Sequence, residues 1–331
     1  MRQKVLVARA VFADAIARLR EHFEVETNDA DELWSQTETI RRLQGKVGLF
    51  ITGTQPIDLA LLSACPQLRA VCSMAVGYNN VDLPACTARG VLVSNAPDVL
   101  TQTTADFGFA LMMAAARRIT ESEHFLRRGE WTKWSYDLFA GADVHGAALG
   151  ILGMGRIGQA IARRGALGFG MRVLYHNRSR LSAGLEAELS ASYVTKEQLL
   201  RTCDHLVIVL PYSPASHHTI GAAELALMKA TATLTNIARG GIVDDAALAH
   251  ALHERRIAAA GLDVFEGEPA VHPDLLTLPN VVLTPHIASA SLPTRRAMAH
   301  LAVDNLIAAL GAGPHAGRPP TALNPEVLAR R

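Results

Sequence analysis

The amino-acid sequence predicts an α/β protein with two doubly wound parallel-sheet domains. Two observations lead to this fold class. Short apolar segments alternate with helical patterns along nearly the whole chain, and such alternation is typical of βαβ units whose parallel sheets are covered on both faces. The strand-like segments are too many for one sheet of ordinary size, and 331 residues suit about two domains.

The first set of elements lies within the first hundred residues. Helical patterns at 13–23 and 57–65 stand between strand-like segments at 4–8, 47–53, 68–74 and 91–96. A long helical pattern then begins at Thr101 and runs to about Arg118. We expect this helix to cross into the second domain.

The second set of elements carries the chain to residue 286. Its strand-like segments are 147–153, 172–176, 204–211, 233–238, 258–264 and 281–286. A final helix within 290–310, with Pro293 suited to its first turn, could return the chain to the first domain. The predicted domains are therefore 1–99 plus 292–331, which would bind the substrate, and 100–291, which would bind a dinucleotide.

The charge and composition of the chain disfavour some classes of binding partner. Lys and Arg number 32 against 31 for Asp and Glu, which argues against a general nucleic-acid or membrane-surface binder. The N-terminus lacks a signal-peptide pattern, and the longest apolar run, 107–116, is far shorter than a membrane span. The four cysteines fit neither a zinc ribbon nor a disulfide framework. We expect a soluble cytoplasmic protein.

A metal site is not predicted. His217 and His218 are adjacent in the turn-like stretch "SPASHHTIG", but no further ligand stands at a suitable spacing.

A glycine-rich turn follows the strand-like segment at 147–153. Gly153, Gly155 and Gly158 have G-x-G-x-x-G spacing. The first permits a tight turn, the second lets the backbone approach a pyrophosphate, and the third lets the following helix pack on the strand. The helix N-terminus would offer N–H groups to the phosphates. The predicted dinucleotide-binding loop is Gly153, Met154, Gly155, Arg156, Ile157 and Gly158.

The next strand-like segment ends in the sequence "NRSR". An NAD-binding chain usually carries Asp or Glu here for the ribose 2′-OH, whereas this chain has Asn177, Arg178, Ser179 and Arg180. We therefore predict a site for the 2′-phosphate of NADP, with Arg178 as the favoured ligand and NADH as a possible second cofactor. The alternative is a solvated basic turn.

Three later strand ends each carry one polar residue, namely Arg239, Glu268 and His286. Taken singly, each residue has a structural explanation: Arg239 as an ion-pair partner, Glu268 as a solvated acid and His286 as a loop histidine. Jointly they fit reduction of a 2-keto acid. Arg binds a carboxylate through two donors, His supplies a proton near neutral pH, and a neighbouring carboxylate favours the imidazolium and raises the pKa of such a histidine.

With these features, the chain resembles the D-isomer-specific 2-hydroxyacid dehydrogenases over nearly its whole length. The motifs are "GYNNVD", "APDVLTQTTAD", "LGILGMGRIGQAIARR", "LPYSPASHHTIG", "NIARGGIVDDAAL", "AGLDVFEGEP" and "LTPHIASAS". The resemblance implies Rossmann-like domains with the active site in the cleft between them, and Arg239, Glu268 and His286 as the catalytic set. It also implies that the backbone of Val76 and Gly77 helps hold the substrate carboxylate. Asp263 would contact the nicotinamide carboxamide, and Thr104, Leu210, Pro211, Ile237 and Ala238 would line the cofactor.

Within the family, the chain most resembles glyoxylate/hydroxypyruvate reductases and bacterial 2-ketogluconate reductases, which mostly prefer NADPH. This implies a homodimer, and in some of these enzymes a tryptophan at the position of Trp134 reaches the substrate pocket of a neighbouring subunit. One departure is Ala288, where glycine is frequent.

Three alternatives stay open. An NAD-linked 3-phosphoglycerate dehydrogenase is disfavoured because no acid follows "LYH" and no long regulatory domain follows the last helix. A formate dehydrogenase would carry Gln in place of Glu268. A dinucleotide-sensing interaction protein on the same fold could retain all three polar residues, and it would bind NADPH without turnover.

Overall fold

The protein is described here by a computed structural model covering residues 2–330. The chain divides into two compact units, residues 1–100 with 291–331 and residues 101–290. The predicted domain boundaries differ from these by one residue at each junction. The assignment of one unit to the substrate and the other to the cofactor stays a prediction.

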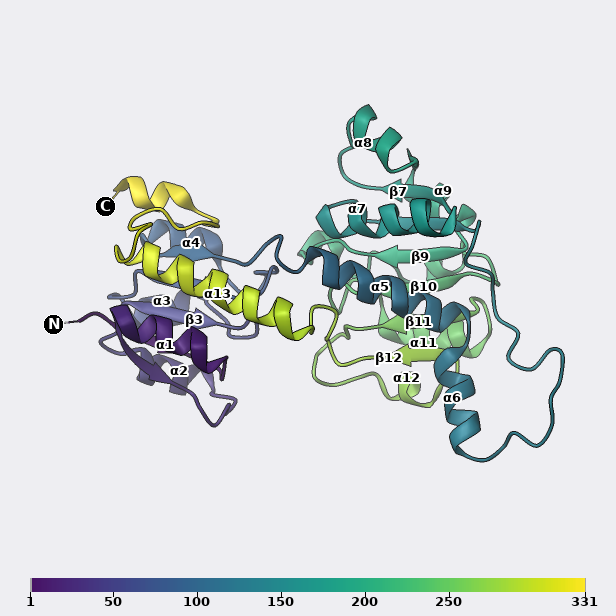
Figure 1. The fold of residues 1–331 in the computed structure, drawn as a ribbon, viewed down its shortest axis with the longest axis horizontal. Helices are drawn as coiled ribbons and strands as arrows, with labels where there is room; N and C mark the ends of the chain where they lie inside the picture. The colour runs from purple at the N-terminus through teal and green to yellow at the C-terminus, as the bar shows by residue number, and fades with distance from the viewer. Residues whose placement is uncertain (1, 331) are drawn as a thin grey trace. The chain divides into compact units, whose positions relative to one another are not determined.

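The first unit is built on a five-stranded sheet whose strands all run parallel, in the order β2-β1-β3-β4-β5. The strands are β1 (Lys4–Val7), β2 (Glu24–Thr27), β3 (Gly48–Ile51), β4 (Ala70–Ser73) and β5 (Leu92–Ser94). The helices are α1 (Ala13–His22), α2 (Gln36–Leu43), α3 (Leu59–Ala64), α4 (Leu83–Ala88), α13 (Leu292–Ala309) and the 3₁₀ segment η3 (Pro325–Arg330). Helices α1 and α13 contact each other, and α13 lies on β3 and β4 (Figure 1).

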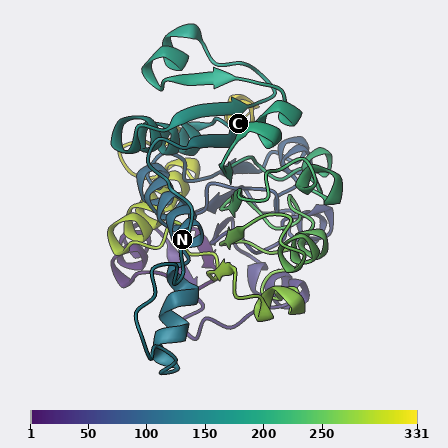
Figure 2. The same ribbon diagram turned by 90° about the vertical axis from the view of Figure 1, so that its right-hand side faces the viewer.

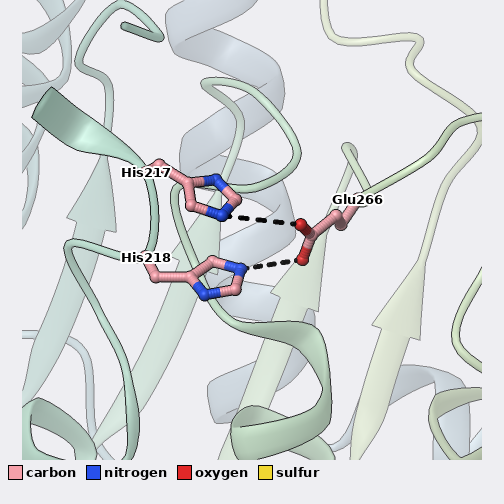
Figure 3. Close-up of side chains that lie close together, drawn as sticks. All are labelled: His217, His218 and Glu266. Atoms are coloured by element: carbon pink, nitrogen blue, oxygen red, sulfur yellow. Dashed lines mark hydrogen bonds and ion pairs between the residues drawn. The ribbon is translucent and has the colours of Figure 1, made fainter. Parts of the chain in front are cut away.

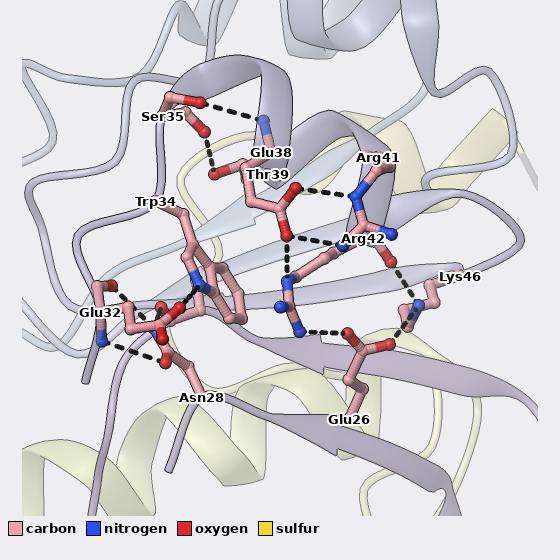
Figure 4. A network of polar contacts seen from close by, with 11 residues as sticks. Glu26, Asn28, Glu32, Trp34, Ser35, Glu38, Thr39, Arg41, Arg42 and Lys46 are labelled. Atoms are coloured by element: carbon pink, nitrogen blue, oxygen red, sulfur yellow. Dashed lines mark hydrogen bonds and ion pairs between the residues drawn. The ribbon is translucent and has the colours of Figure 1, made fainter. Parts of the chain in front are cut away.

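A polar network surrounds α2 in this unit (Figure 4). The Ser35 side chain caps the helix by accepting from the Glu38 N–H, as N-cap serines do. Glu38 accepts from both Arg41 and Arg42, and these hydrogen bonds lower its pKa to about 2. The Arg42 guanidinium lies 4.2 Å from the centre of the Trp34 ring. Arg42 also pairs with Glu26 of β2 at 3.1 Å, so the network joins α2 to this strand through contacts that are each of modest energy.

The second unit is built on a seven-stranded parallel sheet in the order β12-β11-β10-β9-β6-β7-β8. Figure 2 shows the ribbon turned so that this unit faces the viewer. The strands are β6 (Ala148–Leu152), β7 (Arg172–His176), β8 (Ala191–Tyr193), β9 (His205–Ile208), β10 (Thr233–Asn236), β11 (Ala259–Leu262) and β12 (Val281–Leu283). The strands β6, β7 and β8 follow one another towards one edge of the sheet, and β9, β10, β11 and β12 follow one another towards the other edge. The order therefore reverses between β6 and β9, which makes a topological switch point.

Helices cover both faces of the second sheet. The helices of this unit are α5 (Thr101–Ala116), α6 (Ile119–Arg127), α7 (Arg156–Arg163), α8 (Ala183–Glu188), α9 (Lys196–Thr202), α10 (Ala222–Leu225), α11 (Asp245–His253) and α12 (Pro273–Thr277), with a π-helical turn η1 (Arg164–Gly168) and a 3₁₀ turn η2 (Pro214–Ser216). Successive residues of β9 face opposite cores: Leu206 packs in the cluster with α9 and α11, and Val207 in the cluster with α5 and α7. Both sheets are wholly parallel, so the predicted fold class is confirmed.

Some elements differ from the prediction. The helix predicted from Thr101 to about Arg118 ends at Ala116, because Arg118 adopts φ 51° and starts the separate helix α6. The strands β2 and β8 were not predicted. In residues 2–330, no helix is both long enough and apolar enough to cross a membrane.

Candidate active site

The predicted site residues of the second unit gather at one edge of its sheet. Because all seven strands are parallel, their carboxyl ends meet at the same edge. The glycine loop follows β6, "NRSR" follows β7, Leu210 and Pro211 follow β9, Arg239 follows β10, Asp263 follows β11, and His286 follows β12. Glu268 lies in the loop after Asp263.

The glycine loop has the shape that its sequence predicts. Gly153 adopts φ +104°, and a Cβ there would lie 2.8 Å from the backbone of Val209 and Leu210. A Cβ at Gly158 would lie 2.3 Å from the Gly153 carbonyl oxygen, so only glycine allows α7 to approach the strand so closely. At Gly155 a Cβ would have no neighbour within 4 Å. The chain therefore leaves space beside the N-terminus of α7, where a pyrophosphate would bind.

His286 and Glu268 form a hydrogen-bonded pair. His286 Nδ1 lies 2.8 Å from Glu268 Oε2, and since a carboxylate only accepts, Nδ1 is the donor. The other oxygen, Oε1, accepts from the Phe265 N–H at 2.9 Å. Burial would raise the pKa of Glu268, but the hydrogen bond from His286, helped by the Phe265 N–H and more weakly by the charge of Arg239, outweighs burial and holds this pKa below its ordinary value. The imidazole is thereby oriented, and its Nε2 points away from Glu268.

Arg239 sits in a turn that Asn236 supports from both sides. The buried Asn236 side chain accepts from the Ala238 N–H at 3.0 Å and donates to the Arg239 carbonyl at 3.2 Å. Burial lowers the pKa of the Arg239 guanidinium, and the Glu268 carboxylate opposes this shift. The guanidinium remains a cation at neutral pH.

The fully buried Asp263 carboxylate holds the loop that carries His286. It accepts from the Thr284 hydroxyl at 2.7 Å and from the backbone N–H groups of Ile287 and Ala288, each at 2.8 Å. Burial raises the pKa of Asp263, against these bonds. His286 itself has φ 54°, a left-handed conformation that is uncommon for a residue with a side chain. The bonds from Asp263 on both sides of His286 maintain this strained turn.

The "NRSR" segment contains two arginines in different surroundings. Arg180 donates to both oxygens of Glu186, at 2.8 Å and 2.7 Å, and Glu186 also accepts from the Tyr175 hydroxyl at 2.7 Å. The Arg180 and Tyr175 hydrogen bonds lower the pKa of Glu186 to about 2. The Arg178 side chain is exposed and has no ion-pair partner among residues 2–330.

The remaining residues that the sequence singles out for the site lie in both units. The Thr104 hydroxyl is buried without a hydrogen-bond partner in residues 2–330, and its role towards the cofactor stays a prediction. In the first unit, Val76 and Gly77 follow β4, and the Asn95 side chain donates to the Val76 carbonyl at 2.7 Å. Trp134 is 76% exposed. The Ala288 methyl packs into the core beside α5 and α7.

Sequence reasoning missed Asn236, Glu186 and Tyr175. Asn236 lies within the quoted motif "NIARGGIVDDAAL", which could have drawn attention to it. Nothing in the sequence links Glu186 to Arg180, because their contact depends on how α8 packs against β7.

A doubly wound sheet with a glycine loop at its switch point and a His–Glu pair at the same edge defines a class of dinucleotide-dependent dehydrogenases. The family model "D-isomer specific 2-hydroxyacid dehydrogenase, NAD binding domain" matches residues 109–288. The chain therefore belongs to the D-isomer specific 2-hydroxyacid dehydrogenase family, as its motifs predict, and its cofactor class is a nicotinamide dinucleotide.

Individual relatives support this membership. The chain is 45% identical to glyoxylate reductase of Thermococcus onnurineus, over 99% of this chain and 98% of that protein. Among solved structures it is similar to an NADPH-dependent glyoxylate/hydroxypyruvate reductase of Sinorhizobium meliloti in complex with NADP and malonate, with 34% identity, 98% of each chain covered and a TM-score of 0.85. A glyoxylate reductase from Paecilomyes thermophila shares 32% identity over 98% of this chain and 99% of its own, with a TM-score of 0.87.

Proposed function

We propose that the protein reduces a small 2-keto acid to the D-2-hydroxy acid with NADPH, and that glyoxylate, hydroxypyruvate and 2-ketogluconate are the candidate substrates. The observation that carries the proposal is the His286–Glu268 pair, with Nδ1 and Oε2 2.8 Å apart, at the sheet edge that also bears the glycine loop. The reductase names of the relatives agree with the direction of reduction.

Each polar residue has one role in this proposal. The nicotinamide cofactor, when bound, supplies the hydride for the carbonyl carbon. His286 donates a proton from Nε2 to the carbonyl oxygen, which becomes the hydroxyl group. Glu268 accepts from Nδ1, and so stabilises the imidazolium before transfer. Arg239 binds the substrate carboxylate.

The proposed preference for NADPH depends on the end of β7. In place of the acidic residue expected of an NAD enzyme, the chain carries Asn177, Arg178, Ser179 and Arg180. The exposed Arg178 is the proposed ligand of the 2′-phosphate. Arg180 is already held by Glu186, so its proposed role is to fix the turn that presents Arg178, Asn177 and Ser179.

We also propose a homodimer formed through the second unit. Exposed apolar side chains cluster on α6 and the segment after it, namely Ile119, Leu126, Trp131, Trp134, Tyr136 and Leu138. A monomer rarely leaves so many large apolar groups in solvent. A cytoplasmic location, which we also propose, fits the four cysteines, which are all unpaired and buried.

The test is a comparison of initial rates for glyoxylate, hydroxypyruvate and 2-ketogluconate with NADPH and with NADH. We expect oxidation of NADPH by at least one substrate, with a higher kcat/KM than for NADH. If the protein binds NADPH but oxidises it with none of the three, a dinucleotide-sensing role replaces this proposal.

A further inference from the structure

Two adjacent histidines and a distant glutamate meet at the surface of the second unit (Figure 3). His217 and His218 follow the turn η2, and Glu266 follows β11, 48 residues further along the chain than His218. His218 Nε2 lies 2.9 Å from Glu266 Oε2, and His217 Nε2 lies 3.9 Å from Glu266 Oε1. One ligand atom from each of the three residues falls within 4.8 Å of the others. Glu266 is therefore the third candidate ligand, which is distant in sequence but is brought to the two histidines by the fold.

Each imidazole has its second nitrogen against another polar group. His217 Nδ1 lies 3.3 Å from the Tyr212 hydroxyl, and His218 Nδ1 lies 3.8 Å from Asp244 Oδ2. Both Nε2 atoms consequently face the Glu266 carboxylate. Without an ion, His218 Nε2 donates to Glu266, since a carboxylate only accepts. A cation bound here would take the place of the proton on that nitrogen, while Tyr212 and Asp244 lie beside the two Nδ1 atoms.

The backbone on both sides of the cluster is held in place. The His218 N–H donates to the Gly241 carbonyl at 2.7 Å, and the Glu266 N–H donates to the buried Asp245 carboxylate at 2.9 Å. The two imidazole rings stack with centroids 3.8 Å apart. The backbone that carries the three side chains is thus already ordered, and only the side chains must turn to share an ion, which lowers the entropic cost of binding.

From this geometry we propose that His217, His218 and Glu266 bind a divalent transition-metal cation, with Zn²⁺ as the ion that best suits the set. Two imidazole nitrogens and one carboxylate oxygen form a known zinc ligand set, which leaves a fourth position for water. A tetrahedral ion would need these atoms about 3.3 Å apart. The side chains are 37–43% exposed and can close by the required amount.

The ligand set discriminates between ions. Imidazole nitrogens favour zinc and its neighbours in the transition series over magnesium and calcium, which prefer oxygen ligands alone. Binding must also compete with protons for the imidazoles, so affinity should fall in acid. The site uses none of the residues proposed for keto-acid reduction, and the proposal stands independently of that function.

The experiment is calorimetric titration of the full-length, tag-free protein with ZnCl₂ after treatment with a chelator. We expect one saturable site, a thermal midpoint raised by Zn²⁺ and restored by EDTA, and no comparable effect of MgCl₂. Glu266→Gln and the double variant His217→Gln/His218→Gln should each weaken Zn²⁺ binding about ten-fold or more, because even an outer-shell change costs about 10–100-fold. His253→Gln, which changes an exposed histidine of α11, is the matched control and should bind as wild type does.

Each contrary result overturns the proposal. If wild-type protein takes up no Zn²⁺ saturably, the cluster is an ordinary His–Glu ion pair. If Glu266→Gln or the double variant binds as wild type does, or if His253→Gln loses as much affinity, the ion binds elsewhere. Circular dichroism spectra of the variants without metal separate loss of a ligand from loss of folding.

Discussion

Both carboxylate oxygens of Glu186 accept hydrogen bonds from the Arg180 guanidinium, at 2.8 Å and 2.7 Å, and the same carboxylate accepts from the hydroxyl of Tyr175. Tyr175 is fully buried in β7, so this chain of contacts joins the core of the second unit to the turn that follows β7. The turn is thereby fixed by Arg180, and Arg178 is left exposed to solvent.

The two arginines should therefore differ in their effect on cofactor preference. Arg178→Ala should weaken NADPH about ten-fold or more and leave NADH nearly unchanged, since a charge-assisted hydrogen bond contributes about 1.5–3 kcal/mol. Arg180→Ala is the matched control, and we expect it to change the NADPH-to-NADH ratio less. Dissociation constants from quenching of protein fluorescence measure both. Equal losses for the two cofactors in Arg178→Ala would leave "NRSR" as a solvated basic turn.

Removal of the proposed proton donor should affect chemistry and spare cofactor binding. His286→Ala should reduce kcat about 10²–10⁴-fold, the usual contribution of a positioned acid, with an NADPH dissociation constant close to that of wild type. Steady-state rates and fluorescence titration give the two numbers. Near wild-type turnover would refute the assignment of His286.

Arg239 should matter for both binding and turnover. Arg239→Ala removes the cation proposed for the substrate carboxylate, and we expect kcat/KM to fall about ten- to a hundred-fold or more, with KM raised. Arg239→Lys keeps the charge but loses the planar fork, and should recover only part of the loss. If both variants keep the wild-type KM and kcat, the carboxylate binds elsewhere.

The lowered pKa of Glu268 predicts an effect of pH on stability. A carboxyl group whose pKa is lower in the folded than in the unfolded protein stabilises the fold above its unfolded value, here 4.5, and loses that contribution as the pH falls through the folded value. Urea denaturation of wild type and Glu268→Gln should show the wild type more stable near pH 7, with the difference shrinking below about pH 4.5. A difference that grows in acid would contradict this sign.

The dimer proposal predicts a change of mass on one substitution. Tyr136 is 88% exposed in the segment after α6. If this segment is covered by a second copy, Tyr136→Arg should shift the mass measured by light scattering at micromolar concentration towards the monomer. A monomeric wild type would remove the basis of the proposal.

The interior of both sheets could be predicted because interior strands of a parallel sheet are apolar on both faces. The same reasoning missed β2, with the sequence "EVET", and β8, with "ASY", which lie at sheet edges and keep polar side chains. The break between α5 and α6 was also missed, since Arg118 enters the left-handed region without a glycine to signal it.

At the candidate site, the sequence singles out residues with distinctive chemistry, whose roles stay predictions, but it does not indicate the residues that support them. Arg239, Glu268 and His286 stand at strand ends in recognisable motifs. The contacts of Asp263 with Ile287 and of His218 with Glu266 join segments more than twenty residues apart. Such pairings depend on the order of strands in the sheet, which local sequence patterns do not encode.

The helix α13 begins at Leu292, after the whole second unit, yet it lies on β3 and β4 of the first. Residues 322–324 likewise pair with the edge of β5, where the Leu323 N–H donates to the Val93 carbonyl at 2.8 Å. A chain emerging from the ribosome therefore begins its first unit early and completes it last. Throughout translation of the second unit, the apolar side chains beneath α13 have no native cover, and exposed surface of this kind is prone to aggregation.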